Sequence, residues 1–84
     1  MESATLLTPQ QALRAAIKIV GSQAAMGRLL GVSQAAVWLW LKENKALPAE
    51  HVLAVEAATG VSRHDLRPDI YPREDTPSVG EAAA

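Results

Sequence analysis

The sequence lacks cysteine, long apolar runs and any strong net charge. Without cysteine the chain has neither disulfides nor thiolate metal ligands, which fits a reducing compartment. No apolar run approaches the ~20 residues of a membrane span, so we expect no membrane partner. Residues 1–4 have no basic region leading into an apolar stretch, and we expect no signal peptide. These absences predict a cytoplasmic protein, and its 84 residues are enough for one domain.

The formal net charge is −1, and its distribution is more informative than its sum. Segment 8–67 has seven Lys and Arg residues against four Asp and Glu residues, a balance of +3. Segment 68–84 has one basic residue against four acidic residues, a balance of −3. A mildly basic domain followed by an acidic tail is compatible with DNA binding, although the charge alone is a weak signal.

Helix-start and helix-stop residues divide the middle of the chain into four or five short helices. Thr8 and Pro9 start the first helix, and Gln11 completes a capping box. Further starts are predicted at Ser22, Ser33, Pro48 and Ser62, and helix ends at Gly21, Gly31, Gly60 and just before Pro68. No alternation of apolar and polar residues is long enough for a strand. The predicted fold class is therefore all-α, a small bundle of four to five helices.

Apolar residues at helical spacing predict which side of each helix is buried. The expected inner faces are Leu13, Ala16, Ile17 and Val20 in the first helix, Ala25, Met26, Leu29 and Leu30 in the second, Val37, Trp40 and Leu41 in the third, and Val52, Val55 and either Ala58 or Thr59 in the fourth. Residues 71–84 offer almost nothing to bury. We therefore predict a flexible N-terminus at 1–7, a folded domain at 8–70 and a disordered acidic tail at 71–84.

Residues 23–42 have the pattern of a helix-turn-helix. Two short helices that cross at a steep angle need a small residue at the crossing, and Gly27 supplies it. The turn needs a residue that accepts positive φ, and Gly31 supplies it. Val37 is the apolar residue that points into the shared core. These three scaffold residues stand at the spacing of the motif.

In such motifs the second helix enters the major groove, and its early residues contact base edges. Gln34 is suited to a bidentate contact with adenine, and Ala35 to a thymine methyl. Lys42 is suited to a phosphate or a late base, and Gln23, at the start of the preceding helix, to a phosphate. The residues expected to contact DNA are Gln23, Ser33, Gln34, Ala35, Trp38, Leu39, Lys42 and Lys45.

The segment resembles the Cro/CI type of phage and bacterial regulators, with a lambda-repressor-like helix-turn-helix. Three following runs narrow the resemblance to the YdaS-like branch: Leu47-Pro48-Ala49-Glu50-His51, Ala57-Ala58-Thr59-Gly60 and Ser62-Arg63-His64-Asp65-Leu66-Arg67-Pro68-Asp69. The resemblance implies a bacterial or prophage transcription regulator, for example a repressor or an antitoxin. It implies a nucleoid-associated protein that binds double-stranded operator DNA as a homodimer, and a toxin or second regulator as a further protein partner.

Trp38 and Leu39 depart from the family pattern, which usually has small polar or amide residues there. They either pack against thymine methyls and sugars or contact another protein chain. The second alternative makes the chain a protein-interaction module on the same fold, using Trp38, Leu39 and the tail. A third helix rotated from this assignment would bury Trp38 and expose Trp40, but the spacing with Val37 favours Trp40 and Leu41 as core.

The remaining titratable residues do not indicate catalysis. His51 and His64 are thirteen residues apart, without further residues at metal-ligand spacing. Glu56 is expected to pair with a main-chain N–H or an arginine. No combination of nucleophile, base and orienting group is visible, so we expect no enzyme, no metal and no cofactor.

Overall fold

The computed structural model describes residues 7–72 of the chain. Within this range it is all-helical, with no strand. The elements in order are α1 (Pro9–Val20), α2 (Gln23–Leu30), α3 (Gln34–Lys42), the short 3-10 helix η1 (Ala49–His51), α4 (Val52–Thr59) and α5 (Arg63–Leu66). The predicted fold class is confirmed.

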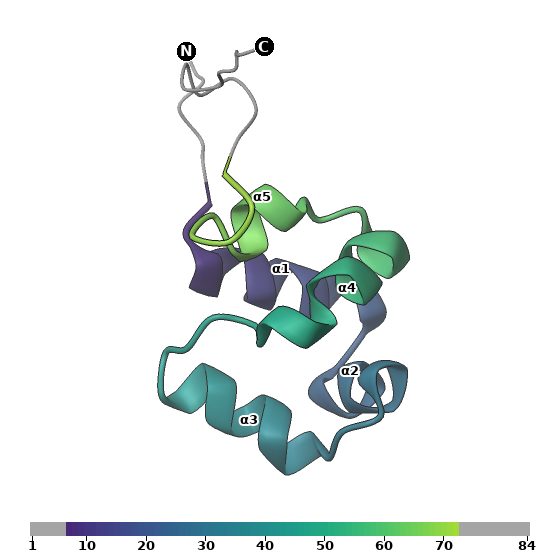
Figure 1. Ribbon diagram of the computed structural model, residues 1–84. Coiled ribbons are helices and arrows are strands. Elements are labelled where there is room, and N and C mark those ends of the chain that lie inside the picture. The colour runs from purple at the N-terminus through teal and green to yellow at the C-terminus, as the bar shows by residue number, and fades with distance from the viewer. Residues whose placement is uncertain (1–6, 73–84) are drawn as a thin grey trace, which may run out of the picture.

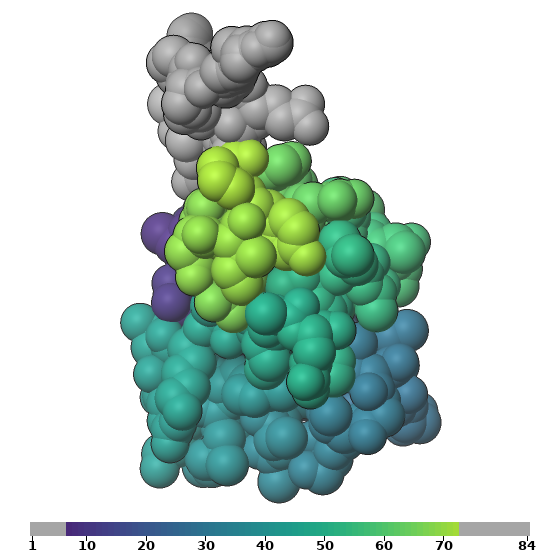
Figure 2. Space-filling view, in the orientation of Figure 1, coloured from purple at the N-terminus to yellow at the C-terminus, as the bar shows by residue number. Residues whose placement is uncertain are grey.

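The helices surround one core, and α1 lies at its centre. Helix α1 packs against α2, α4 and α5, while α2 packs against α3. Figure 1 shows α3 at one end of the molecule and α5 at the other. The space-filling view has the same order, with the blue and teal residues of α2 and α3 below the yellow-green segment that follows α5 (Figure 2). The buried core residues are Ala12, Leu13, Ala16, Ile17, Met26, Val37, Leu47, Val52, Val55 and Leu66.

Four of the five predicted helix starts, at Thr8, Ser22, Ser33 and Ser62, agree with the structure. Gln11 N–H donates to Thr8 Oγ1 over 3.1 Å, and Thr8 N–H donates to Gln11 Oε1 over 3.0 Å, which completes the capping box. Ser22, Ser33 and Ser62 each accept a main-chain N–H within the first turn of α2, α3 and α5. Each cap satisfies a donor that has no partner within its helix, so the caps fix where these short helices start.

The ends of α2 and α3 require left-handed backbone. Gly31 has φ +74° just after α2, as predicted. Asn44 has φ +58° just after α3, and the N–H groups of Asn44 and Lys45 return to the carbonyls of Leu41 and Trp40. These two hydrogen bonds are those of the Schellman motif. Asparagine is one of the few residues besides glycine that accepts the left-handed backbone of this motif.

The predicted inner face is wrong at Leu29, and of the two alternatives in the fourth helix Thr59 is the inner residue. Leu29 is 43% exposed, because at 3.6 residues per turn it lies on the side of α2 opposite Gly27, which faces α3. Thr59, the alternative to Ala58, is half-buried, and its hydroxyl donates to the Val55 carbonyl over 2.7 Å. Pro48 precedes η1 rather than α4, so the fourth helix starts one turn later than its first residues suggested.

Tyr71 packs against the core, although the sequence pattern predicts that it belongs to the tail. The Arg63 guanidinium lies 5.7 Å from the centre of its ring, and the Tyr71 carbonyl is 2.8 Å from His64 Nδ1. A single aromatic ring therefore extends the folded unit past the predicted boundary. Residues 73–84 of the predicted tail, and residues 1–6 of the predicted flexible N-terminus, lie outside the described residues.

Candidate nucleic-acid interface

Helix α2 and the start of α3 meet at Gly27, which is buried. A Cβ on Gly27 would lie 2.7 Å from the Val32 carbonyl oxygen and 3.3 Å from the Ser33 carbonyl carbon. The Val32 N–H also donates to the Gly27 carbonyl over 2.9 Å. Only glycine fits this approach without a shift of the main chain, which is consistent with the predicted place of Gly27 at the helix crossing.

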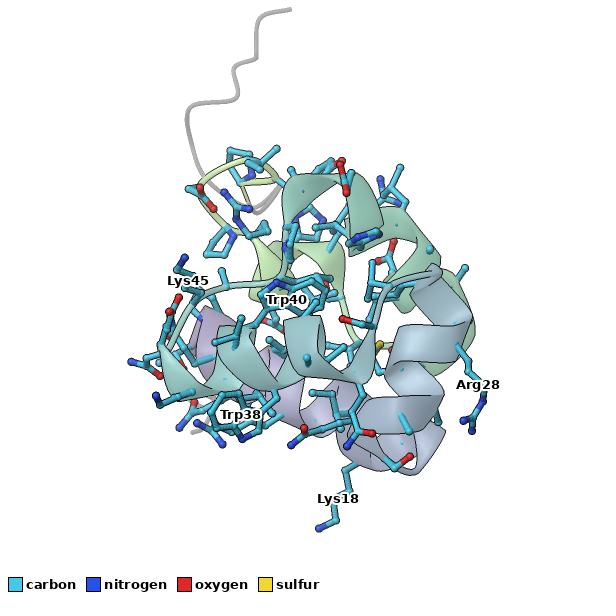
Figure 3. All side chains as sticks on the ribbon, turned by 90° about the horizontal axis from the view of Figure 1, so that it is seen from below. Lys18, Arg28, Trp38, Trp40 and Lys45 are labelled. Atoms are coloured by element: carbon cyan, nitrogen blue, oxygen red, sulfur yellow. The ribbon has the colours of Figure 1, made fainter. Side chains whose placement is uncertain are left out.

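Helix α3 has the rotation that its spacing predicted. Val37 is fully buried, and Trp40 and Leu41 pack against the core. Trp38 and Leu39 are 47% and 42% exposed. Figure 3 shows Trp38 and Trp40 on opposite sides of α3. The alternative rotation, with Trp38 inside, is wrong.

The outward side of α3 is mainly apolar, with a cation at its end. At 3.6 residues per turn, Ala35, Trp38, Leu39 and Lys42 fall within roughly a third of the helix circumference. All four are exposed, and so is Gln34 beside them. Lys42 Nζ lies 5.2 Å from the centre of the Trp38 ring, within the range of a cation–π interaction. We call Gln34, Ala35, Trp38, Leu39 and Lys42 the outer face of α3.

Three further residues predicted to contact DNA lie beside this face, and they differ in whether their polar atoms already have a partner within the protein. The Ser33 hydroxyl accepts the Ala36 N–H over 3.0 Å, so this oxygen is occupied by helix capping. Gln23 is half-exposed at the first residue of α2, directly after the Ser22 cap. Lys45 follows α3, and its Nζ is 3.0 Å from a Glu43 carboxylate oxygen; both side chains are exposed, so this pair contributes little to stability.

Basic and acidic residues lie on different helices. This separation is sharper than the difference in net charge between segments 8–67 and 68–84. Between Glu2 and Glu43 the chain has four basic residues and no acidic residue. These cations are Arg14, Lys18, Arg28 and Lys42 on α1, α2 and α3, and all four are exposed. Lys18 and Arg28 extend away from the body of the molecule (Figure 3). The acidic residues of the described range all follow α3, so α1 to α3 form a basic half. The position of Glu43 in the printed sequence was the signal that could have revealed this division.

The remaining titratable groups hold the fold together. Arg63 donates to both carboxylate oxygens of Glu56, from its main-chain N–H over 3.2 Å and from Nε over 2.8 Å. The main-chain bond first, and then the guanidinium, lower the pKa of Glu56. Arg67 makes two bonds to Asp69, of 3.0 and 2.8 Å, and these lower the pKa of Asp69. The expected pairing of Glu56 is confirmed, and these carboxylates serve the structure.

The two histidines also have local partners. The His51 ring centre is 5.9 Å from that of Trp40, and its Nε2 is 3.3 Å from a Glu50 oxygen. Nowhere in residues 7–72 do three His, Asp or Glu side chains gather as a metal site would require. None of the helices in this range is long and apolar enough to cross a membrane.

Comparisons with known proteins agree with this architecture. The chain is 51% identical over 57 residues to a protein of Escherichia coli strain K12 named "Putative transcriptional regulator YdaS"; the match covers 66% of this chain and 58% of that protein. The chain therefore spans little more than half of this relative's length. The "Cro protein from putative prophage element Xfaso 1 in Xylella fastidiosa strain Ann-1" has a similar structure, with a TM-score of 0.67 and 34% identity, over 74% of this chain and 97% of that one. Residues 13–75 match the family model described as "Bacterial toxin YdaS", and the chain belongs to this YdaS family.

Proposed function

We propose that the chain is a DNA-binding transcription regulator that inserts the outer face of α3 into the major groove. The observation that supports this most directly is the crossing at Gly27, which fixes α2 against the start of α3 and leaves the outer face of α3 uncovered. A rigid, uncovered helix next to a second helix N-terminus is the arrangement by which helix-turn-helix proteins contact DNA. The basic half formed by α1 to α3 favours a polyanion on the same side.

The individual roles follow from position. Gln34 stands exposed in the first turn of α3 and is suited to reading an adenine edge. Gln23 and the free N–H groups at the start of α2 are suited to a phosphate, as is Lys42 at the end of α3. Lys45 would assist Lys42 once DNA phosphate competes with Glu43. A protein that makes these contacts would act as a repressor or activator in the cytoplasm, where bacterial DNA lies.

The test is an unbiased selection of duplexes by the purified chain, followed by titration of the selected duplex at several salt concentrations. The affinity is expected to fall steeply with salt, since bound cations release counterions from the phosphates. Replacing Gln34 with alanine should cost about 1–3 kcal/mol and relax the preference at one base pair. Gln10→Ala is the matched control: it removes an amide that donates to the Asn44 carbonyl, outside the helix-turn-helix, and should keep the base preference. Salt-insensitive binding, or none, would overturn the proposal.

We further propose that the regulator acts as a homodimer. One helix-turn-helix contacts few base pairs, and two half-sites about one helical turn apart supply the additional affinity. Analytical ultracentrifugation of the protein with a duplex containing one or two half-sites measures this directly. The two-half-site duplex is expected to take up two chains cooperatively; independent uptake of single chains would contradict the dimer.

The exposure of Trp38 and Leu39 favours a second candidate, a protein-interaction module. The family model is described as a bacterial toxin, and the sequence also resembles antitoxins, which makes a protein partner the second candidate. The pair of changes Trp38→Ala and Leu39→Ser separates the two functions. Loss of a partner complex with DNA binding intact would support the interaction module, and loss of DNA binding with an unchanged oligomeric state would support the regulator.

A further inference from the structure

The outer face of α3 has an unusual chemistry for a surface that reads bases. Gln34 alone offers an amide there, and the neighbouring Ser33 oxygen already accepts the Ala36 N–H over 3.0 Å, which leaves its O–H as a donor. The next positions outward, Ala35, Trp38 and Leu39, are apolar apart from the indole N–H. Few polar side chains are therefore available on this helix for direct readout of bases.

The major groove contains one apolar feature that such a face can contact. Thymine alone among the four bases presents a methyl group there, on C5, and beside it the O4 acceptor. A tryptophan presents a flat apolar ring and a single N–H donor, which is the complementary pattern. Alanine and leucine present only methyl groups.

The surroundings of Trp38 favour DNA over a protein chain as the partner of this face. The Lys42 ammonium lies 5.2 Å from the Trp38 ring centre, so any occupant of the ring also meets a cation. Helices α1 to α3 contribute three further exposed cations, and the carboxylate that follows Lys42, Glu43, is paired with Lys45 over 3.0 Å. A groove lined by phosphates satisfies these charges, whereas an apolar protein surface would leave them without partners.

We propose that Trp38 and Leu39 select thymine methyl groups, so that the operator half-site is an A·T-containing sequence read by Gln34 at adenine and by this apolar pair at neighbouring thymines. The inference rests on the proposed DNA binding and identifies the base chemistry that the site recognises. Trp38 and Leu39 are thus specificity-determining residues, while Lys42 holds the adjacent phosphate.

The experiment replaces thymine with deoxyuridine, which keeps Watson–Crick pairing and O4 but lacks the C5 methyl. The probe is the duplex selected by the purified chain, with deoxyuridine placed inside the half-site or, as a control, in the flanking base pairs. Removing one contacted methyl is expected to weaken binding about fourfold, the value of burying one methylene-sized group. Substitution in the flanks is expected to have no effect.

The same titrations with protein variants show which residues cause the loss of affinity for the deoxyuridine duplex. In Trp38→Ala and Leu39→Ala the penalty for deoxyuridine at the corresponding thymine should disappear. Leu53→Ala on α4 is the matched control, since Leu53 is 48% exposed and Leu39 is 42% exposed. Leu53→Ala should retain the full penalty. Circular dichroism confirms that each variant is folded, and the wild-type comparison of the two duplexes needs no variant at all.

Each outcome decides between the proposals. Equal wild-type affinity for the thymine and deoxyuridine duplexes would overturn methyl recognition and leave DNA binding intact. An unchanged penalty in both variants would overturn the assignment to Trp38 and Leu39. A free protein dimer that Trp38→Ala dissociates would show that a second chain occupies the face, and would also overturn the inference. Absence of any salt-sensitive duplex binding would instead remove the proposed function itself.

Discussion

Two glycines of the helix-turn-helix serve different physical requirements, although both stand at predicted positions. Gly27 is needed for space, since a Cβ would lie 2.7 Å from the Val32 carbonyl oxygen. Gly31 has open space around it but a φ of +74°. A side chain at Gly27 therefore displaces main chain, whereas a side chain at Gly31 only strains its own backbone.

Substitutions that differ in size and conformational preference separate the two roles. Gly27→Ala should lower the free energy of unfolding by about 1–3 kcal/mol, the usual cost of overpacking. Gly31→Ala should cost about 1–2 kcal/mol, and Gly31→Asn less, because asparagine accepts the left-handed region. Gly27→Asn should be worse than Gly27→Ala. Urea denaturation measures all four, and a Gly27→Ala protein of wild-type stability would contradict the close crossing.

Helix caps were the most predictable part of the structure, because a cap depends on residues within one turn. Thr8, Ser22, Ser33 and Ser62 all act as the local sequence indicates. Which side of a helix is buried was less predictable, since this depends on its neighbours. Leu29 has the right spacing for the core of α2, but α1 and α3 both approach from the other side.

The cap of α3 allows its structural role to be separated from its proposed contact with DNA. Ser33→Ala removes the acceptor for the Ala36 N–H and should lower the free energy of unfolding by about 1 kcal/mol. Ser33→Asp keeps an equally good cap but places a negative charge where the helix approaches phosphate. We expect Ser33→Asp to retain wild-type stability and to lose DNA affinity. Loss of stability in Ser33→Asp, or unchanged affinity, would contradict this view of the helix start.

The junction of α4 and α5 depends on Glu56, which accepts two bonds from Arg63. Because the folded pKa lies below the ordinary 4.5, the unfolded chain binds the proton more readily. The stabilisation is therefore complete above the unfolded pKa and is lost as the pH falls through the folded pKa. Asp69, lowered from 3.8 by Arg67, behaves in the same way at lower pH.

Urea denaturation between pH 6 and pH 3, a range set by these carboxyl groups, tests the junction. The wild-type free energy of unfolding should decline below about pH 4.5, and Glu56→Gln should reduce this decline. Asp69→Asn should remove a separate part of it, and the double variant should show the smallest decline. A Glu56→Gln profile that runs parallel to the wild type would contradict a role for the Glu56 carboxylate in the junction.

At the scale of the whole molecule, the sequence predicted the class of fold but not its charge division. The seven-to-four balance of segment 8–67 averages a basic half with an acidic one, because α4 and α5 lie within the same segment. The boundary between basic and acidic residues, at the end of α3, corresponds to a spatial division because α2 packs against both α1 and α3. Tyr71 was assigned to the tail for a related reason: its contacts with Arg63 and His64 come from packing at α5 rather than from its own neighbours in sequence.

The charge division predicts that DNA affinity depends on the position of each cation and not on the net charge of −1. Lys18→Ala, on the basic half, should reduce the slope of log affinity against log salt by about one. Ile70→Lys adds a cation in the segment after α5, at the end of the molecule opposite α3 (Figure 1), where Ile70 is 40% exposed. It raises the net charge by one unit and should leave the slope unchanged, because no phosphate lies there. Equal and opposite changes of the salt slope in the two variants would mean that only the net charge of the protein attracts DNA. The basic half would then have no part in orienting the protein on DNA.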